Sequence, residues 1–515
     1  MKIRLHQIHT KTVLIVLLYT FFLFFSACTN PFMKNILGQG SGSGSRINPW
    51  RISSADDLLK IVSGDEPGWT LDAYYRLTGD ITLPAADWIP IGYEASNIKS
   101  FTGTFDGAGY TIYNLTINMD ASDQGLFAEI GSRGTVRNLK LDTVSITTNS
   151  SSYQNIGSLA GSNNGTVENC HVSGNVSGGS STGGLIGSNT GTIRNSSSAA
   201  SIEDLMPPPS GDSGTGFGSL VGSNGESGRV EYSFATGNVN APNAYSVGGL
   251  VGNNRGTVRN SDAAGNVTGR NQVGGVVGDN FSFVRNSSSS GNVNGRNHIG
   301  GVVGRNAYSL AVVEFCYATG TITSNEPSAY SSTLAGTGGI VGFNEGTVQN
   351  CYAEGNVTIE NPSHSGSTNT VPPPSVGGIA GINTGTIQLC YATGTVSTSD
   401  TISTNKPYVG GVVGANGWGT GTSNIGTVQN NVALNLQVTA VSGSDIGRVA
   451  GFHAAGGSLS NNHARGDMSV TVSGTAKSTL DTGEDRVDGE TTTSWPSTWF
   501  RSIGFTNSWW TGRLP

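Results

Sequence analysis

Three tyrosines are the residues of this chain whose type and spacing best suit ligand chemistry. Tyr317, Tyr352 and Tyr391 each stand between a cysteine and an alanine in three copies of one triplet, Cys-Tyr-Ala. If the triplets hold equivalent places in stacked repeats, the three rings point outward from adjacent coils in a single file. Such a file can hold a sugar against its rings, or can simply stabilise the wall that carries it. The pattern therefore predicts a candidate ligand-binding strip and, as its alternative, a structural ladder.

The cysteines of these triplets are expected to be buried thiols. Cys316, Cys351 and Cys390 share an inward position on successive coils, and Cys170 holds the same position about five coils earlier. Coils separated by about 4.8 Å would place Cys170 beyond disulfide reach of the others. Buried cysteine usually behaves as a small hydrophobic residue, so we expect no structural disulfide.

Motifs of catalytic centres find no suitable setting in this sequence. Gly211–Gly214 reads Gly-Asp-Ser-Gly, like the nucleophile motif of chymotrypsin-like proteases, but it lies in a proline-rich insertion without a hydrolase context. Asp262, Glu314 and Glu354 fall at different positions of the repeat, so no paired carboxylates for glycoside cleavage recur. Five histidines outside the N-terminal segment lack the spacing of zinc ligands: His171, His298, His364, His453 and His463. We expect a non-enzyme with no catalytic residue, metal or cofactor.

A short adhesion motif lies near the end of the repeats. Arg465, Gly466 and Asp467 form an Arg-Gly-Asp sequence of the integrin-binding kind. It aligns with the ordinary corner before the third strand of a repeat, where every coil has a glycine. An exposed turn would suit such a ligand, and an ordinary corner is the alternative.

The elements that must position these side chains are copies of one repeat. Four close copies are Val247–Gly269, Val273–Gly295, Thr337–Thr358 and Val376–Ser397. Each holds three short runs rich in Val, Ile and Thr, bounded by Gly and Asn, which is typical of strands and too short for helices. Stacked copies bury a core that one unit cannot bury alone. The chain is predicted to be all-β, a parallel β-helix (β-solenoid) of about twelve three-strand coils.

Equivalent positions of successive repeats form columns along the stack, and two of these columns predict the corners and the core. An asparagine follows the second strand of most coils, and a left-handed corner there restores the inward phase of the next residues. Tyr232, Phe315 and Leu389 interrupt this column, which we interpret as structural: Asn114, Asn138, Asn169, Asn195, Asn260, Asn286, Asn350, Asn430 and Asn461. The next column should face the core: Leu115, Leu139, Cys170, Ser196, Ser233, Ser261, Ser287, Cys316, Cys351, Cys390, Asn431 and Asn462.

These units resemble the repeats of the GLUG-motif family. Gly249-Leu250-Val251-Gly252 matches the Gly-Leu-X-Gly core, and the segment from Asn48 to Ile117 is similar to the region that precedes such repeats in bacterial surface proteins. The resemblance covers roughly Asn48–Val472. It implies a right-handed β-helix on a cell-surface or secreted protein, in some relatives an adhesin, and it does not indicate the ligand.

The N-terminal segment predicts export and lipid attachment. A basic start followed by the apolar run Val13–Phe25 is typical of a signal peptide, and the run is too short to span a bilayer comfortably. Small residues just before Cys28 resemble a bacterial lipobox, which implies cleavage before Cys28 and lipidation of its thiol. Residues 1–27 are therefore predicted to be a lipoprotein signal peptide, with an ordinary signal peptide as the alternative.

The remaining segments flank the coils. Residues 28–47 are rich in Gly and Ser and are predicted to form a flexible tether. Residues 48–74 form an N-terminal cap with a short helix over Ser54–Val62 that starts at an N-cap serine. The coils occupy residues 75–472. The Trp-rich segment 473–515 is predicted to cap the last coil, or to offer a glycan-stacking patch.

Composition and insertions limit the function. Only 12% of the 515 residues are charged, and a net charge of −7 offers no basic surface for nucleic acid. Insertions should emerge along one edge, either as a binding face or as tolerated variation: Glu203–Gly216, Ala241–Ser246, Ser324–Gly336, Glu360–Ser375 and Thr398–Tyr408. We predict a non-catalytic, lipid-anchored protein of the cell envelope, at the outer membrane or cell surface, that binds a glycan or a host or neighbour-cell protein. The alternatives are a polysaccharide-acting lyase or glycosidase, and a purely structural surface rod.

Overall fold

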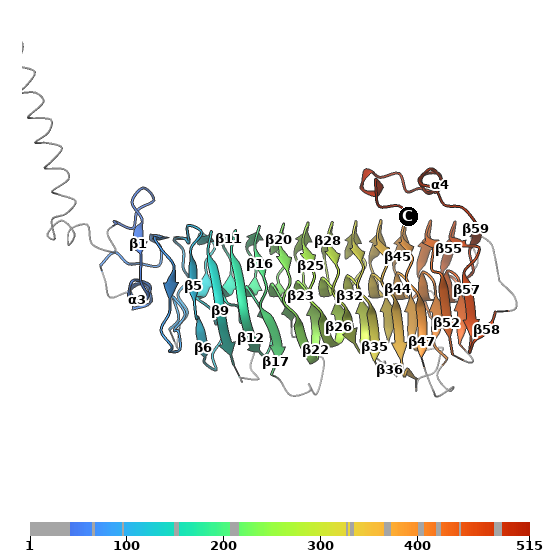
Figure 1. Cartoon of the computed structure of the whole chain (residues 1–515), viewed down its shortest axis with the longest axis horizontal. Helices are drawn as coiled ribbons and strands as arrows, with labels where there is room; N and C mark the ends of the chain where they lie inside the picture. The colour runs from blue at the N-terminus through green and yellow to red at the C-terminus, as the bar shows by residue number, and fades with distance from the viewer. Residues whose placement is uncertain are drawn as a thin grey trace, which may run out of the picture.

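The chain folds into one long parallel β-helix. The computed structural model describes residues 42–515 apart from 64–66, 95–96, 149–153, 206–215, 326–327, 330–333, 365–371, 400–405, 419–423, 442–443 and 478–486. Its strands stack in parallel, coil on coil, into a rod (Figure 1), which confirms the predicted all-β solenoid. The predicted signal peptide, Cys28 and most of the tether lie outside the described residues. Within the described part of the chain, no helix is both long enough and apolar enough to cross a bilayer.

One coil shows how the repeat becomes walls. It contains β23 (Val251–Asn254), β24 (Thr257–Arg259), β25 (Asp262–Ala263) and β26 (Val267–Gly274). Each strand pairs in parallel with its equivalent in the next coil. The second of the three predicted runs, Gly256–Ala263, forms two strands, β24 and β25, because the chain turns at Asn260 between them.

Three walls result from this stacking. The first wall has 14 strands, from β1 (Trp50–Ile52) to β55 (Ser458–Ser460). The second wall has 11 strands, from β7 (Phe127–Ile130) to β54 (Ala450–His453). The third wall carries β25, β26 and their equivalents. The first wall has more rungs than the roughly twelve predicted, because its N-terminal rungs do not show the residues of the repeat.

The predicted inward column lies in the core. From Leu139 to Asn462 its members are at most 2% exposed, cysteines, serines and asparagines included. The middle residues of the first-wall strands, such as Val258 and Val284, are fully buried beside it. Burial of these like residues in successive coils makes one continuous core, since each coil covers the apolar face of its neighbour.

The asparagine corners adopt the left-handed backbone that was predicted. From Asn138 to Asn461 the eight asparagines of the column have φ between 49° and 56°. Tyr232, Phe315 and Leu389 take the same conformation, at φ of 50°, 57° and 54°. A bulky residue in this region is strained by about 1–2 kcal/mol, so the stack, and not the residue type, determines the corner.

The place of Asn114 in this column was wrong. Asn114 is left-handed, with φ of 62°, but its side chain accepts a hydrogen bond from the hydroxyl of Thr143, within the third wall. Asp106 pairs with Arg137, so the first-wall corner of that coil falls at Gly107. Leu115 is buried, but it follows the Asn114 corner in the third wall and is not equivalent to Leu139. The first coils do not follow the spacing of the later ones.

A second ladder of asparagines runs through the interior and was not predicted. Each side-chain amide donates from Nδ2 to the Oδ1 of the next coil at 2.7–2.9 Å. All members are fully buried: Asn163, Asn189, Asn224, Asn254, Asn280, Asn306, Asn344, Asn383 and Asn416. They occupy the ends of the second-wall strands. Because an amide both donates and accepts, one residue type satisfies itself in every coil.

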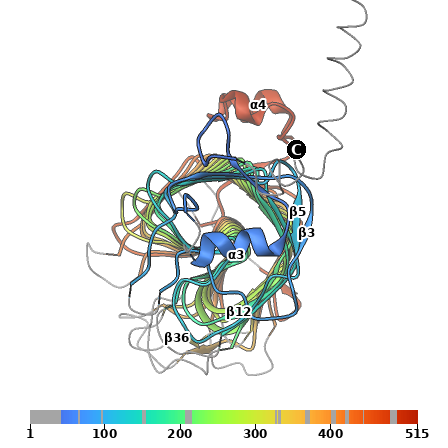
Figure 2. The same cartoon turned by 90° about the vertical axis from the view of Figure 1, so that its left-hand side faces the viewer.

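Helix α3 closes the N-terminal end of the stack. It spans Ala55–Ser63 and lies across the first coil (Figure 2). The hydroxyl of Ser54 accepts the backbone N–H of Asp57 at 3.2 Å, as expected of an N-cap. Leu58 and Ile61 are at most 2% exposed, so the apolar face of the helix covers the open end of the core.

The C-terminal end is closed by a short strand and a buried arginine. Strand β59 (Glu490–Thr492) adds a last parallel strand to the third wall. Arg448, 1% exposed, donates from Nη2 to the carbonyl of Gly489 and to the hydroxyl of Thr491 at 3.2 and 2.9 Å. It stands where most preceding coils have the second glycine of a pair. Within the predicted cap 473–515, this strand closes the end, and the tryptophans lie elsewhere.

The interior ladder should contribute strongly to stability. In Asn280→Ala, the amide of Asn254 loses one of its acceptors and the Oδ1 of Asn306 loses its donor inside the core, which should cost about 2–3 kcal/mol. The measurement is the urea midpoint followed by circular dichroism. Thr268→Ala, at a half-exposed position of the third wall, is the control and should change little. Equal midpoints for the two variants would contradict a stabilising role of the ladder.

Candidate functional site

The three predicted tyrosines form one stack. Tyr317, Tyr352 and Tyr391 pair in register on adjacent coils, which confirms the predicted file. The rings of Tyr317 and Tyr352 lie 4.9 Å apart with an interplanar angle of 2°, and those of Tyr352 and Tyr391 lie 5.1 Å apart at 5°. These separations match the rung spacing, because each ring leaves the wall at an equivalent position.

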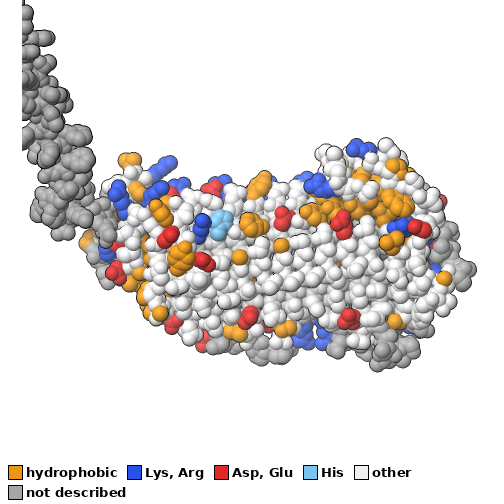
Figure 3. Space-filling model, in the orientation of Figure 1, with side chains coloured by type: hydrophobic (Ala, Val, Ile, Leu, Met, Phe, Trp, Pro, Cys, Tyr) orange, Lys and Arg blue, Asp and Glu red, His pale blue; other side chains and the backbone are white. Residues whose placement is uncertain are grey.

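A C-terminal segment lies on this file, and we call residues 495–514 the strap. It contains helix α4 (Ser497–Ser502) and the 3-10 helix η1 (Ser508–Trp510), and it runs back beside the rod (Figure 1). Phe500 and Trp510 are at most 1% exposed and contact the rings of the tyrosine file. Apolar side chains gather where the strap meets the wall (Figure 3).

The strap covers two of the three candidate ligand-binding tyrosines. Tyr352 is 9% and Tyr391 is 2% exposed, whereas Tyr317 is half-buried. The hydroxyl of Tyr391 donates to the carbonyl of Arg513, and Trp510 Nε1 donates to Asn350 Oδ1 at 3.2 Å. Burial raises the pKa of Tyr352 to about 12. The prediction of three rings open to a sugar is therefore wrong with the strap docked, because Tyr352 and Tyr391 pack against the strap.

The predicted tryptophan patch is part of the same contact. Trp509 packs against Phe315 and Tyr352, with ring centroids 5.7 and 5.8 Å apart. Trp499 lies edge-on to His463 at 5.1 Å. These rings bind the tail to the side of the rod, so the expected cap over the last coil is replaced by a contact that crosses several coils.

The described cysteines are buried free thiols. Cys316, Cys351 and Cys390 share the inward column, and each thiol donates to the carbonyl two residues before it at 3.2 Å. Burial raises the pKa of Cys170 to about 12, so this thiol is protonated and unreactive at neutral pH. Cys28, the candidate lipidation site, lies outside the described residues.

Away from the strap, the rod leaves aromatic and charged side chains exposed. Tyr232, at the corner of one coil, is 57% exposed, and Phe234, two residues later, is 49% exposed. Phe283 is 49% exposed on the first wall. Opposite charges pair between adjacent coils along that wall: Glu168 with Arg194, Glu231 with Arg259, and Glu314 with Arg285. This surface combines exposed rings with hydrogen-bonding groups held at fixed spacing.

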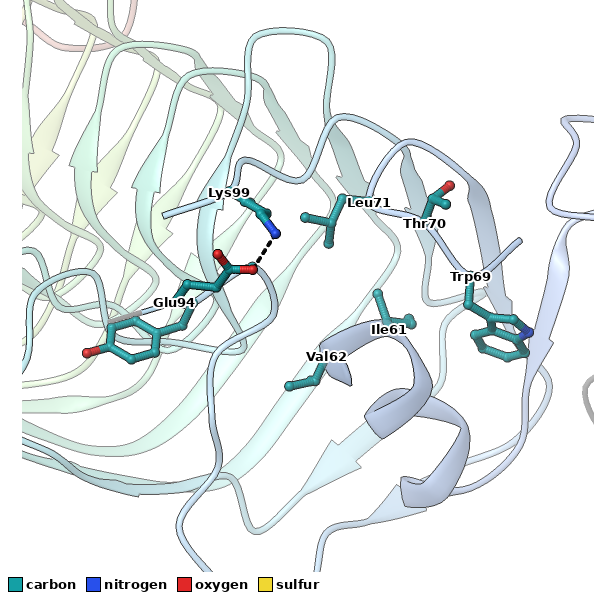
Figure 4. A pocket seen from close by; sticks show the side chains of 9 residues that line it. Ile61, Val62, Trp69, Thr70, Leu71, Glu94 and Lys99 are labelled. Atoms are coloured by element: carbon teal, nitrogen blue, oxygen red, sulfur yellow. Dashed lines mark hydrogen bonds and ion pairs between the residues drawn. The ribbon is translucent and has the colours of Figure 1, made fainter. Parts of the chain in front are cut away.

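A pocket of about 270 Å³ lies between helix α3 and the first coils (Figure 4). Trp69 and Leu71 line its apolar side, and Glu94 forms an ion pair with Lys99 on its polar side. Glu94 is the one carboxylate among its lining residues, whereas two-carboxylate glycoside cleavage needs a pair about 5–10 Å apart. The pocket therefore gives no support to the glycosidase alternative.

The Arg-Gly-Asp motif is closed on itself. Arg465 donates from Nε and Nη2 to both carboxylate oxygens of Asp467, at 2.7 and 2.8 Å. The guanidinium also lies over the ring of Trp495, 5.1 Å from its centroid. The Arg465 side chain is 15% exposed, so it is not presented as a free ligand.

The insertions leave the rod from one edge. Three of the strands that precede them, β35 (Ile322–Asn325), β41 (Val357–Glu360) and β47 (Val396–Ser399), pair in register. The common edge is therefore confirmed for these coils. Most inserted residues, including Gly211–Gly214, lie outside the described residues. Near the C-terminal end of this edge, an open hollow of about 400 Å³ is lined mainly by hydroxyl and amide side chains.

A cluster of titratable side chains lies on the outer face of the second wall, with Asp279 buried and Arg305, Glu345 and His298 partly exposed. Arg305 donates from Nε and Nη2 to Glu345 at 3.0 and 2.8 Å. Asp279 Oδ1 and both ring nitrogens of His298 have no hydrogen-bond partner within the described part of the chain. Burial raises the pKa of Asp279 to about 7 against the attraction of Arg305, and burial lowers the pKa of His298 to about 3. Asp279 therefore titrates near neutral pH, and His298 stays uncharged.

Asp279 should make the stability of the rod depend on pH. Its folded pKa of about 7 lies above the ordinary value of 3.8, so the folded state loses stability as pH rises through 7. Asp279→Asn keeps the shape and removes this charge. We expect the variant to melt above the parent at about pH 8.5, with the difference shrinking at about pH 5.5. Asp87→Asn, at an exposed position, is the control, and a pH-independent difference for Asp279→Asn would contradict the assignment.

The strap should detach when its central ring is removed. Trp510→Ala deletes a side chain buried against Tyr391 and Phe505, a loss of about 3–5 kcal/mol of packing. Trypsin should then cut at Arg501 about tenfold faster or more, while the β-sheet signal in circular dichroism stays unchanged. Thr511→Ala, an exposed neighbour, is the control. Equal cleavage rates in the parent and Trp510→Ala would show that Trp510 does not hold the strap.

Two curated relatives match about a fifth of the chain. Halomucin of Haloquadratum walsbyi is 36% identical over 119 residues, which is 22% of this chain and 1% of halomucin. A provisionally named Gly-rich membrane protein of Evansella cellulosilytica is 34% identical over 117 residues, which is 21% of this chain and 13% of that protein. The chain thus spans a small part of both relatives.

The chain is also similar to a solved structure and matches a family motif. The crystal structure of a provisionally assigned immunoglobulin A1 protease from Bacteroides ovatus covers 88% of this chain and 86% of its own, at 16% identity and a TM-score of 0.22, too low to support an argument. The GLUG motif matches five stretches: 152–177, 243–268, 295–323, 334–358 and 373–397. All five fall on coils of the β-helix, so this chain carries repeats of the GLUG motif.

Proposed function

We propose that this chain is a lipid-anchored rod of the cell envelope, displayed at the outer membrane or cell surface, that acts by binding and not by catalysis. Cys28 would carry the lipid, and residues 28–47 would hold the rod away from the membrane. The names of its two relatives, a halomucin and a membrane protein, support a surface repeat protein of the envelope. The ligand would be a glycan or a protein of a host or neighbouring cell.

The exposed aromatic and charged surface is the observation that carries this proposal. Tyr232, Phe234 and Phe283 are about half exposed on a scaffold whose strands are paired in register on both sides. Exposed apolar groups with polar neighbours mark interaction sites. Rigid spacing favours binding, because little conformational freedom is lost when a ligand docks.

The two alternatives receive less support from the geometry. The pocket beside helix α3 holds one carboxylate, already paired with Lys99, which does not suit a lyase or glycosidase. A purely structural rod would give no reason to expose Tyr232 and Phe234, since exposed rings add little to the packing of the wall.

The experiment expresses the full chain in a bacterial host and compares the parent with Cys28→Ala. In parent cells the chain should incorporate labelled palmitate, and added protease should cleave it at the cell surface. The parent cells should also bind to immobilised glycans or cell-surface proteins. Cys28→Ala should lose the label and release the rod, while Cys170→Ala should retain both label and surface exposure. Palmitate label on Cys28→Ala would contradict the proposal. So would parent cells that bind the immobilised glycans and proteins no better than cells without the chain.

A further inference from the structure

Four consecutive rungs of the tyrosine file bring two aromatic platforms to the ends of a polar strip. Phe234, Asp262, Ser288 and Tyr317 pair in register, one residue per coil. Three rung steps therefore separate Phe234 from Tyr317, which is roughly 14 Å. This distance leaves room for a small ligand between one ring and the other.

Tyr317 ends the ring stack on this side. Tyr352 covers one face of its ring, but the next rung toward Phe234 carries Ser288 instead of another ring. The ring of Tyr317 is half-buried because Tyr352 and the strap cover one side of it. At the opposite end, Phe234 is 49% exposed, and Tyr232, two residues earlier on the same coil, is 57% exposed.

The strip between the rings both donates and accepts hydrogen bonds. Asn286 donates from Nδ2 to Asn260 Oδ1 at 3.2 Å. Among the described residues, the Asn286 side-chain carbonyl and the Asn260 amino group have no further partner and can bond to a ligand. The Oδ1 of Asp262 accepts from the backbone N–H and the hydroxyl of Ser288 at 2.9 and 2.6 Å. The second oxygen of Asp262 receives no hydrogen bond from the described residues. Groups of both kinds suit hydroxyls, which also donate and accept.

The two arginines beside the strip are paired with neighbouring carboxylates. Arg259 pairs with Glu231 at 3.0 Å, and Arg285 pairs with Glu314 at 3.2 Å. The guanidinium of Arg285 also lies 5.1 Å from the centroid of Phe315. Because both cations already have a carboxylate partner, this rim favours an uncharged ligand over a phosphate or sulfate.

We propose that the strip formed by Asn260, Asp262, Asn286 and Ser288, between Phe234 and Tyr317, binds a neutral oligosaccharide. A sugar presents an apolar ring face to an aromatic ring and hydroxyls to the polar side chains between the rings. The site rests on the proposed binding function and gives it a location and a ligand class. It uses the open end of the tyrosine file, and the strap stays docked on the remainder.

The test immobilises the full chain and probes it with neutral hexose oligosaccharides and with a matched sulfated and uronic-acid panel. The parent should bind at least one neutral member and no acidic member more tightly. Phe234→Ala and Tyr317→Ala should each weaken that binding about tenfold. Tyr317→Phe keeps the ring and should bind like the parent, and so should Tyr110→Ala, which removes an exposed ring elsewhere.

Three other results would contradict the proposed sugar site. Unchanged affinity in Phe234→Ala and Tyr317→Ala would show that the rod binds sugars elsewhere, which leaves the proposed function intact. A parent that binds no neutral oligosaccharide, or prefers acidic ones, would refute the ligand class. A loss of binding in Tyr317→Phe equal to that in Tyr317→Ala would refute ring stacking, with thermal melts confirming that each variant is folded.

Discussion

In-register stacking of coils at one rung spacing is the constraint on which the rest of this structure depends. It is enforced where the backbones of adjacent coils approach closely. A Cβ on Gly275 would lie 2.1 Å from the carbonyl oxygen of Gly301, and a Cβ on Gly301 would lie 2.1 Å from that of Gly339. These two glycines are thus required by close approach, whereas Ser158 and Ser219 hold the same place in two earlier coils. Arg448 takes this place in the last coil, where the coil-to-coil glycine series ends.

The same stacking converts side chains into ladders. The interior asparagines hydrogen-bond from coil to coil inside a low-dielectric core, where an unpaired amide would be costly. A shift of the register would unpair every amide at once, so the ladder favours one alignment of the coils. On the outside, the same spacing sets the separation of the tyrosine rings and of the paired charges of the first wall.

The strap divides the outer surface into a packed part and an open part. Under the strap, Tyr352 and Tyr391 contribute apolar area to a second, smaller core. Beyond it, Phe234 and Tyr317 carry the same kind of ring in the same file with part of the ring exposed. One column of residues therefore serves stability in some coils and is available for recognition in others.

Local spacing was sufficient to predict much of this molecule. The solenoid, the left-handed corner at Asn260, the burial of Cys316 and the register of Tyr317 with Tyr352 all follow from a motif repeated coil after coil. Asn114 was misplaced because the first coils depart from that motif. The interior ladder was present in the sequence as a recurring Gly-X-Asn. Whether these asparagine side chains point inward was not predictable, because the turn after each strand decides the direction of the last residue of the strand.

The tertiary structure alone decided what the file of rings can do. Trp510 bonds to Asn350 across a separation of 160 residues, and no periodic signal connects the tail to that coil. Composition predicted an apolar, tryptophan-rich tail, but not whether it covers the end of the rod or its side. Docking on the side depends on the summed apolar contact with several coils. The sequence by itself therefore determined the scaffold and its outward columns, and the long-range packing of the strap determined which rings remain open.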